Sequence, residues 1–146
     1  MSAVKKNEGS CLCGAVKVYA EAMNHELGAC HCSMCRKWTG GPLLSVFCGS
    51  SVRFEGEESA IGVYDSSEWA ERGFCKQCGS GLFYRIKANQ KCMVPVGLFD
   101  AQDDITFTRQ VFIDEKPAYY AFANKTEDLT AADIFAMYGG DSRSDE

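Results

Sequence analysis

The sequence predicts a single, mainly β domain with antiparallel strands and short helical turns. Short runs rich in Val, Ile, Phe and Tyr recur along the chain, and Gly, Asn and Asp turns separate them, as in strands joined by tight connections. Polar and apolar residues alternate in several runs, as they do in strands with one face toward solvent. The length of 146 residues suits one domain with its own core, and no linker rich in Pro, Ser or Gly divides it.

The predicted strands are short, and two short helices accompany them. The runs expected to be strands are Ala15–Ala20, Leu43–Cys48, Ser51–Glu55, Ile61–Asp65, Glu71–Cys75, Gly81–Ile86, Met93–Leu98, Ile105–Thr108 and Gln110–Ile113. Pro95 lies inside one of these runs, which favours an edge strand or a bulge there. Ser33–Trp38 is expected to form one helical turn. A second helix is expected after Thr130, an N-cap residue followed three positions later by Asp133, as in a capping box.

Seven of the nine cysteines fall into three tight groups. These are Cys11-Leu-Cys13, Cys30-His-Cys32-Ser-Met-Cys35 and Cys75-Lys-Gln-Cys78. Two thiolates two or three residues apart can bind one ion from a single turn of chain, and four thiolates complete a tetrahedral zinc site. Seven is four plus three, so the count indicates two Zn²⁺ ions per chain, one in a closed site and one in an open site.

The closed, structural site is predicted to combine the two pairs that are far apart in sequence. Its ligands would be Cys11, Cys13, Cys75 and Cys78. A glycine follows each pair, at Gly14 and Gly79, and glycine lets backbone N–H groups turn toward the sulfurs. Structural zinc contributes on the order of 10 kcal/mol in small zinc domains, so its removal is expected to unfold the chain. The alternative is a redox CxxC, which would need a βαβ setting that this sequence does not show.

The open, catalytic site is predicted at Cys30, Cys32 and Cys35, because no fourth cysteine is close to them in sequence. A catalytic zinc site keeps its fourth position for water or substrate. Three thiolates outweigh the charge of Zn²⁺, which makes the centre weak at generating hydroxide. It is better suited to hold a substrate thiol as thiolate for attack on a carbon electrophile. The alternative is a second closed site, completed by His31, His25 or Cys48.

Four further residues near these motifs carry expectations of their own. His31 lies between two ligands, so its ring is expected to point away from the metal and to support the ligands or handle a proton. His25 is expected to be a surface or loop histidine. Cys48 ends one apolar run and Cys92 precedes another, so both are predicted to be small buried hydrophobic residues.

Composition argues against two classes of partner. The formal net charge is −5 and no basic stripe is present, which argues against nucleic-acid binding. No apolar run approaches the roughly 18–20 residues of a membrane span, and the first eight residues lack the apolar run of a signal peptide. A cytoplasmic, reducing location follows, where grouped cysteines hold metal more often than they form disulfides.

At these cysteines the chain resembles the glutathione-dependent formaldehyde-activating enzymes, also called the centromere protein V/GFA family. The matching segments are Gly9-Ser-Cys-Leu-Cys-Gly-Ala-Val, Cys30-His-Cys-Ser-Met-Cys-Arg-Lys-Trp-Thr-Gly-Gly, Arg72-Gly-Phe-Cys-Lys-Gln-Cys-Gly-Ser-Gly-Leu and Val111-Phe-Ile-Asp-Glu-Lys-Pro-Ala-Tyr-Tyr. The resemblance implies a β-tent zinc fold and the same partition into structural and catalytic zinc. It also implies a carbon–sulfur lyase similar to S-(hydroxymethyl)glutathione synthase, with a small thiol and an aldehyde such as formaldehyde as substrates.

The resemblance also guides the division of the chain and the choice of substrate-binding candidates. We divide the chain into an N-terminal extension (1–8), a zinc domain of this family (9–123) and a C-terminal segment (124–146) with a short helix and a polar tail. Cations that could bind a glutathione carboxylate, or simply be solvated, are Arg36, Lys37, Arg72 and Lys116. Trp38 and Phe74 are expected to shield the zinc sites. The alternative function is a zinc-stapled protein-binding module without catalytic activity, an analogy that rests on the fold alone.

Overall fold

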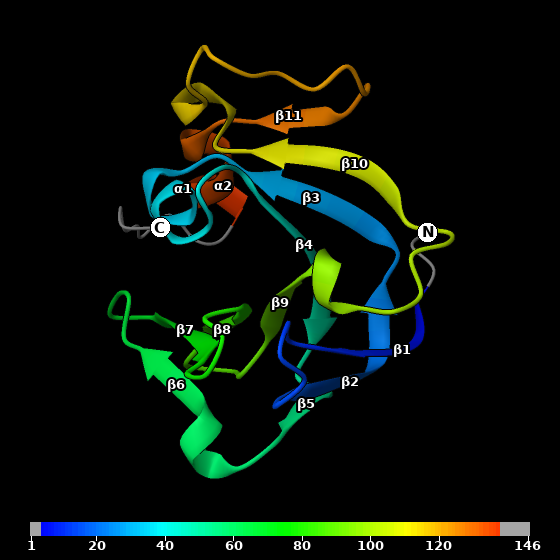
Figure 1. Ribbon diagram of the computed structural model, residues 1–146. Helices are drawn as coiled ribbons and strands as arrows, with labels where there is room; N and C mark the ends of the chain where they lie inside the picture. The colour runs from blue at the N-terminus through cyan, green and yellow to red at the C-terminus, as the bar shows by residue number, and fades with distance from the viewer. Residues whose placement is uncertain (1–3, 138–146) are drawn as a thin grey trace.

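The computed structural model describes residues 4–137, which form two sheets and two short helices (Figure 1). The smaller sheet has the strand order β1-β2-β5, and the larger sheet has the order β11-β10-β3-β4-β9-β8-β7-β6. The prediction of a mainly β fold is therefore confirmed. The predicted polar tail, residues 142–146, lies outside the described residues.

The strands are short and the helices have two turns each. The strands are β1 Val4–Ser10, β2 Lys17–Asn24, β3 Glu26–Cys30, β4 Leu43–Gly49, β5 Val52–Glu55, β6 Ile61–Tyr64, β7 Ala70–Cys75, β8 Gly81–Ile86, β9 Cys92–Pro95, β10 Thr106–Val111 and β11 Glu127–Leu129. The helices are α1 Ser33–Thr39 and α2 Ala131–Met137, and single 3₁₀ turns cover Glu58–Ala60, Val96–Leu98 and Ile113–Glu115. Among the described residues, no helix is long and apolar enough to cross a membrane.

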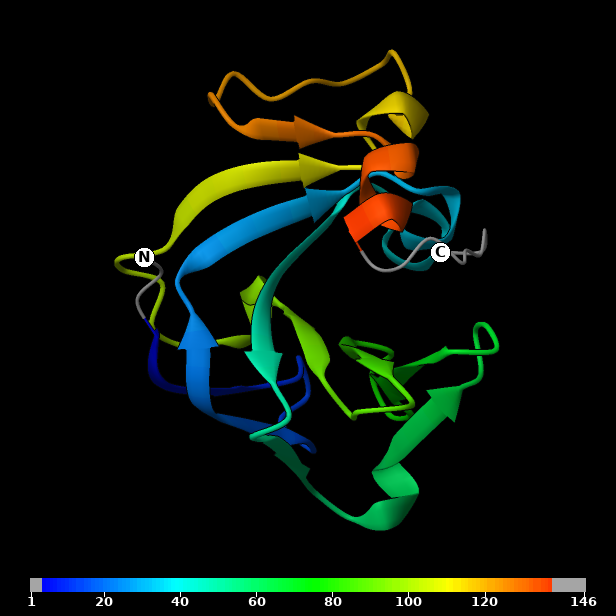
Figure 2. The same cartoon turned by 180° about the vertical axis from the view of Figure 1, so that it is seen from behind.

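The larger sheet is mixed rather than wholly antiparallel. Strand β10 runs parallel to both β3 and β11, while the other pairings within the sheet are antiparallel. One continuous strand β10 replaces the two runs expected there, and its register with β3 shifts between Phe107 and Arg109. Because β3 and β10 are parallel, their carboxyl ends lie at the same end of the sheet, beside α1 and α2 (Figures 1 and 2).

Pro95 corrects one expectation about the sheet. It is the last residue of β9, which lies between β4 and β8, so the edge-strand option is wrong. The register of β4 with β9 does shift, but opposite Met93 and Cys92 rather than at Pro95. Pro95 opposes Ser45 of β4, and the 3₁₀ turn Val96–Leu98 follows it directly. The missing N–H is tolerated at this position because the chain leaves the sheet there.

Two clusters of buried side chains hold the molecule together. The larger one lies between the smaller sheet and the middle of the larger sheet, and includes Met23, Val46, Leu82 and Phe83. The smaller one surrounds the end of β3 and both helices, and includes Leu43, Phe112 and Ile134 together with Cys32 and Cys35. Each cysteine group thus has a different hydrophobic environment.

Helix α2 begins with the predicted capping box. The Asp133 N–H donates to Thr130 Oγ1 at 3.1 Å, and the Thr130 N–H donates to Asp133 Oδ2 at 2.9 Å. This reciprocal pair satisfies backbone donors at the helix start and confirms the prediction.

At the other end of the chain, residues 4–8 belong to β1, which pairs with β2, so they form part of the smaller sheet. The division of the chain into three segments stays a prediction.

Candidate metal centres

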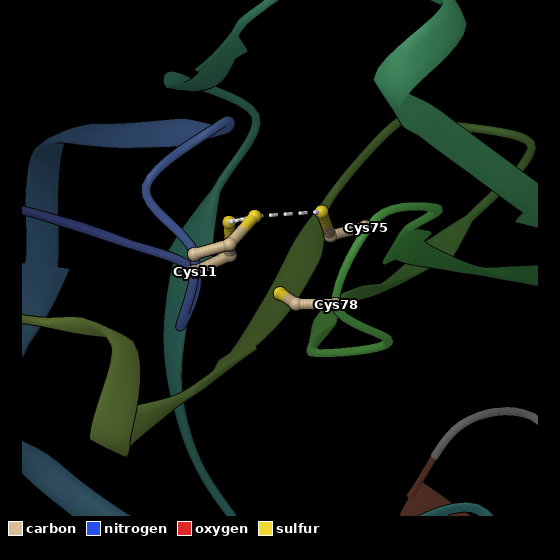
Figure 3. A group of neighbouring side chains, drawn as sticks. Cys11, Cys75 and Cys78 are labelled. Atoms are coloured by element: carbon tan, nitrogen blue, oxygen red, sulfur yellow. Dashed lines mark hydrogen bonds between the residues drawn. The ribbon is translucent and has the colours of Figure 1, made fainter.

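The predicted closed site assembles at the junction of the two sheets (Figure 3). Cys11 and Cys13 follow β1 of the smaller sheet, while Cys75 ends β7 of the larger sheet and Cys78 lies in the turn before β8. All four Sγ atoms lie within 4.8 Å of one another. Residues more than sixty positions apart in sequence therefore meet at one point, and a shared ion would join the two sheets.

The spacing of these sulfurs fits zinc. Cys13 Sγ lies 3.7 Å from Cys11 Sγ and 3.8 Å from Cys75 Sγ. Sulfurs bound at about 2.3 Å to one tetrahedral zinc ion lie about 3.8 Å apart. The donor set could therefore hold zinc with little rearrangement.

The turns that carry these ligands depend on glycine and on donors to sulfur. Gly14 and Gly79 have φ of 84° and 83°, in the left-handed region that glycine adopts without strain. The Val16 N–H donates to Cys11 Sγ at 3.3 Å, which stabilises a thiolate. Hydrogen bonds from the hydroxyl and the backbone N–H of Ser80 lower the pKa of Cys78 to about 5, so this ligand is ionised at neutral pH.

The predicted open site assembles where β3 meets α1. Cys30 ends β3, Cys32 is the N-cap of α1, and Cys35 lies in its first turn. The three Sγ atoms lie within 4.8 Å of one another, and no histidine, carboxylate or further cysteine among residues 4–137 joins them. The structure thus brings together three potential ligands and leaves the fourth position without one in the described part of the chain.

The three thiols oppose one another's ionisation. Hydrogen bonds from Cys30 and then Cys35 lower the pKa of Cys32 to about 2, while the same contact with Cys32 raises the pKa of Cys30 well above its usual range. For Cys35, the hydrogen bond from Cys30 lowers the pKa, but contact with Cys32 and burial together outweigh it and raise the pKa to about 12. Three crowded sulfurs, two of them on buried residues, cannot all ionise without a positive charge among them. This donor set therefore also fits a metal ion, and soft thiolates favour zinc.

His31 points away from the three sulfurs, as expected from its position between two ligands. The side chain is fully buried, with Nε2 2.8 Å from Gln110 Oε1 and Nδ1 2.8 Å from the Tyr120 hydroxyl. The amide oxygen can only accept, so Nε2 carries the proton and Nδ1 accepts from the tyrosine. Both ring nitrogens are occupied, and burial lowers the pKa of His31. His31 therefore supports the ligand loop, and its ring is not exposed to a substrate.

Arg72 is the charged residue beside the open cluster. It lies on β7, is 4% exposed, and places both terminal guanidinium nitrogens 3.8 Å from Cys35 Sγ. Its guanidinium carbon lies 4.9 Å from the ring centres of both Trp38 and Tyr84. The option of a solvated surface role for Arg72 is wrong, because the strand register and the helix enclose it.

The segment after β10 closes the other side of the open cluster. Phe112 has a left-handed backbone with φ of 55° and is buried against Phe135 of α2. This turn directs the next two carboxylates to helix starts: Glu115 Oε1 accepts from the Ser33 N–H at 3.3 Å, and Asp114 Oδ1 accepts from the Ala131 N–H at 2.9 Å. A bulky residue with positive φ is strained, so surrounding packing must hold it there.

The remaining candidates lie apart from the sulfurs or have other partners. Cys48 and Cys92 are fully buried in the larger core, as predicted, and burial raises their pKa values to about 12 and about 11. His25 lies in the bend between β2 and β3, which agrees with the loop option, but it is buried, so the surface option is wrong. Its Nδ1 lies 3.1 Å from the Asp104 carbonyl oxygen. The ring of Phe74 packs across Gly62 of β6.

The cations near the open cluster differ in how much of their donor capacity is used. The Lys116 ammonium donates to the carbonyl oxygens of Pro117 and Tyr120. Arg36 donates its Nε–H to the His31 carbonyl oxygen at 2.9 Å, and Lys37 is exposed on α1.

Sequence reasoning gave no role to Gln110, Tyr84 or Tyr120. Tyr120 lies within a matched motif, and Tyr84 could be found only once the β7–β8 register is known.

Comparison with known proteins gives a family and two relatives. The model of the family described as glutathione-dependent formaldehyde-activating enzyme matches residues 6–115. A Schizosaccharomyces pombe protein named an uncharacterized lyase is 38% identical over 128 residues, which cover 87% of this chain and 93% of that protein. A Halomonas elongata protein, provisionally named a glutathione-dependent formaldehyde-activating enzyme, is 29% identical over 90 residues, covering 52% of this chain and 54% of the relative.

A solved structure shares the fold. The crystal structure of a Rhodobacter sphaeroides protein superposes with a TM-score of 0.56 and 24% identity, covering 64% of this chain and 88% of that chain. At this identity the likeness supports the architecture alone. The superposition agrees with the mainly β fold described above.

Proposed function

This chain belongs to the glutathione-dependent formaldehyde-activating enzyme family, and from that premise we propose that it is a zinc-dependent carbon–sulfur lyase. Its reaction would join a glutathione-like thiol to a small aldehyde such as formaldehyde, or cleave the resulting adduct. The observation that carries the proposal is the cluster of Cys30, Cys32 and Cys35, which lacks a fourth protein ligand among the described residues. A catalytic zinc site needs such an open position.

The proposed reaction is an addition without oxidation or reduction. The thiol sulfur forms a bond to the carbonyl carbon, the C=O double bond becomes a C–O single bond, and the thiol proton ends on that oxygen. The reverse reaction breaks the same S–C bond and returns the proton to sulfur. When bound at the three cysteines, zinc supplies a Lewis acid that favours ionisation of the substrate thiol.

The protein residues around the open cluster would hold the reacting groups and limit the access of water. Trp38 packs against the buried cluster, and its ring faces the Arg72 guanidinium, which brings a positive charge to the sulfurs. His31 fixes the loop that carries Cys30 and Cys32 through its two ring nitrogens. We therefore assign to His31 a positioning role and no proton transfer to substrate.

A glutathione carboxylate would be bound by cations of helix α1. Lys37 is exposed, and Arg36 uses its Nε–H within the protein while its terminal nitrogens can serve a ligand. Lys116 already donates to two carbonyl oxygens, and Arg72 is buried against sulfur. Of the four predicted cations, Arg36 and Lys37 are therefore the ones we propose for the substrate.

We also propose a reducing compartment such as the cytoplasm, because the ligand thiols must stay reduced.

The test is exchange between glutathione and its formaldehyde adduct, followed by NMR on protein whose zinc content is known. We expect two zinc ions per chain and exchange faster than the uncatalysed rate. Cys32→Ala should retain about one zinc per chain and lose the acceleration, because two remaining thiolates hold metal poorly. Cys48→Ala is the matched control, since it removes a buried cysteine from the larger core and should keep both.

Two outcomes would contradict the proposal. Wild-type protein with two zinc ions that leaves the exchange rate unchanged would exclude this thiol and aldehyde pair. A Cys32→Ala variant that exchanges as fast as wild type would remove the open cluster from the reaction. Either result would leave the four-cysteine site intact and favour the protein-binding alternative.

A further inference from the structure

Arg72 is a buried cation whose surroundings lack an ordinary anionic partner. It lies on β7 directly opposite Tyr84 of β8, and only 4% of its surface is exposed. No carboxylate among residues 4–137 forms an ion pair with it. Its Nε–H is buried and has no acceptor in the same part of the chain. The guanidinium is a cation, so its burial without a carboxylate calls for negative charge from another neighbour.

The contacts that Arg72 does make are to one sulfur and two aromatic faces. Both terminal nitrogens lie 3.8 Å from Cys35 Sγ, so the planar guanidinium presents two N–H groups to the same ligand atom. Trp38 and Tyr84 each lie with their ring centres 4.9 Å from the guanidinium carbon, within the range of a cation–π contact. The two rings hold the guanidinium in place and keep water from it.

A buried charge without a counter-charge is strongly unfavourable, so the sulfur it contacts must carry negative charge in the working protein. Cys35 is ionised when it ligates a metal. Three thiolates and Zn²⁺ together are anionic, and an arriving substrate thiolate would add a further negative charge. A fixed cation at the ligand sulfur makes that addition less unfavourable.

We propose that Arg72 is the charge-compensating residue of the three-cysteine centre, and that it allows an anionic sulfur ligand to occupy the open fourth position. It acts through Cys35, so it is a positioning residue, and the aromatic faces of Trp38 and Tyr84 fix its orientation. This inference deepens the proposed function and rests on the open position assigned there. The positive charge of Arg72 favours ionised thiols as the ligands bound at that position.

The experiment uses full-length protein loaded with cobalt(II), which replaces zinc at cysteine sites and absorbs light. Wild type, Arg72→Gln and Arg72→Lys are compared. Arg85→Gln is the matched control, because Arg85 is on the adjacent strand β8, contacts the Phe83 ring, and is paired with Glu71 instead of a sulfur. The first readout is the sulfur-to-cobalt charge-transfer band without added thiol. The second is the change in spectrum on titration with 2-mercaptoethanol. This thiol has no carboxylate that a cation could bind, so its binding reports only whether the fourth position on the metal is open.

Loss of the guanidinium charge makes the ligand sulfur easier to oxidise, so the charge-transfer band of Arg72→Gln should move to lower energy. Its affinity for 2-mercaptoethanol should fall roughly 10–100-fold, the range found when groups that contact metal ligands are removed. Arg72→Lys keeps the charge and should recover most of the thiol affinity. Arg85→Gln should match wild type in both readouts.

The outcomes separate this inference from the proposed function. An Arg72→Gln band at the wild-type energy would overturn the inference, as would an unchanged thiol affinity. Wild-type protein that binds no thiol at all would overturn the proposed function, while the band position would still test the contact between Arg72 and Cys35. If Arg72→Gln fails to fold, Arg72→Lys decides: wild-type thiol affinity supports compensation by charge, and complete loss of thiol binding overturns it.

Discussion

The four-cysteine and three-cysteine clusters use the same ligand atom in opposite settings. The four-cysteine cluster takes its residues from both sheets, and its sulfurs are stabilised by neutral donors such as the Val16 N–H and the Ser80 hydroxyl. The three-cysteine cluster comes from one stretch of six residues, and a charged guanidinium contacts one of its sulfurs. The first arrangement joins distant parts of the chain. The second lacks that long-range connection, and no fourth protein ligand joins it among residues 4–137.

The difference in chain separation predicts a difference in what each metal does for stability. An ion that joins distant segments stabilises the whole fold, whereas an ion bound within one short segment organises that segment. Equivalent substitutions, one in each cluster, should therefore lower the free energy of unfolding by different amounts. Equal losses would contradict this difference between the clusters.

The largest effect is expected from removing one ligand at each cluster. Cys75→Ala should abolish the cooperative thermal transition, because structural zinc contributes on the order of 10 kcal/mol and small domains have about 5–15 kcal/mol in total. Cys32→Ala should keep a cooperative transition and lower the midpoint only by several degrees. Thermal unfolding by circular dichroism, with zinc content measured on the same samples, checks both.

Cys92→Ala controls for the loss of a buried cysteine side chain. Cys92 is 2% exposed in the larger core and belongs to neither cluster, so we expect a cost of about 1 kcal/mol. Equal midpoints for Cys75→Ala and Cys32→Ala would contradict the structural role of the four-cysteine cluster.

A smaller effect is expected at the polar layer behind the three-cysteine cluster. His31→Ala leaves both the Gln110 amide oxygen and the Tyr120 hydroxyl without their partner and opens a cavity. We expect a loss of about 3 kcal/mol in the free energy of unfolding and metal affinity about 10–100-fold weaker at the adjacent site. Tyr120→Phe removes one hydrogen bond and should cost about 1 kcal/mol.

Urea unfolding and chelator competition measure these two quantities. If His31 instead faced the substrate and moved a proton, His31→Ala would slow the reaction while stability and metal affinity stayed at wild-type values. That result would contradict the supporting role given to His31 by its buried position.

The sequence predicted the clusters better than it predicted their surroundings. Tetrahedral coordination imposes short spacings that are visible in Cys11-x-Cys13 and Cys75-x-x-Cys78, and the structure brings those sulfurs together. Capping chemistry is equally local, so Thr130 and Asp133 were assigned correctly. By contrast, the contact between Arg72 and Cys35 depends on how β7 lies against α1. The spacing of residues in the sequence does not reveal this contact. An arginine whose neighbours in space are unknown is expected to lie at the surface.

Strands β1, β3 and β11 are not among the predicted strands, and pairing with other strands accounts for each of them. Strand β1, Val4–Ser10, has mostly polar residues, and its identity as a strand comes from pairing with β2. Strand β11 has only three residues and lies parallel to β10. Parallel pairing joins segments that are distant in sequence, so turn signals between neighbouring runs cannot reveal it. The same pairing places β10, with Gln110, beside the strand that ends at Cys30.

The smallest effect on metal affinity is expected at two glycines that have the same backbone conformation. Gly79, beside the four-cysteine cluster, has φ of 83°, and Gly40, at the C-cap of α1, has φ of 87°. An added Cβ at either position meets no atom within 4 Å, so replacement by alanine costs only backbone strain. We expect that strain to be about 1–2 kcal/mol for an L-residue in the left-handed region.

The two clusters should release this equal strain differently. In Gly79→Ala it falls on the turn between Cys75 and Cys78, whose Gly79 N–H donates to the Cys75 carbonyl oxygen at 2.8 Å. Relief requires moving a ligand, so zinc affinity at the four-cysteine cluster should fall about tenfold, the equivalent of about 1.4 kcal/mol. In Gly40→Ala the last turn of α1 can fray, while Cys32 and Cys35 stay fixed at its first turn. Chelator competition should therefore show wild-type affinity at the three-cysteine cluster, and an equal loss of metal in both variants would contradict the coupling of the four-cysteine cluster to the fold.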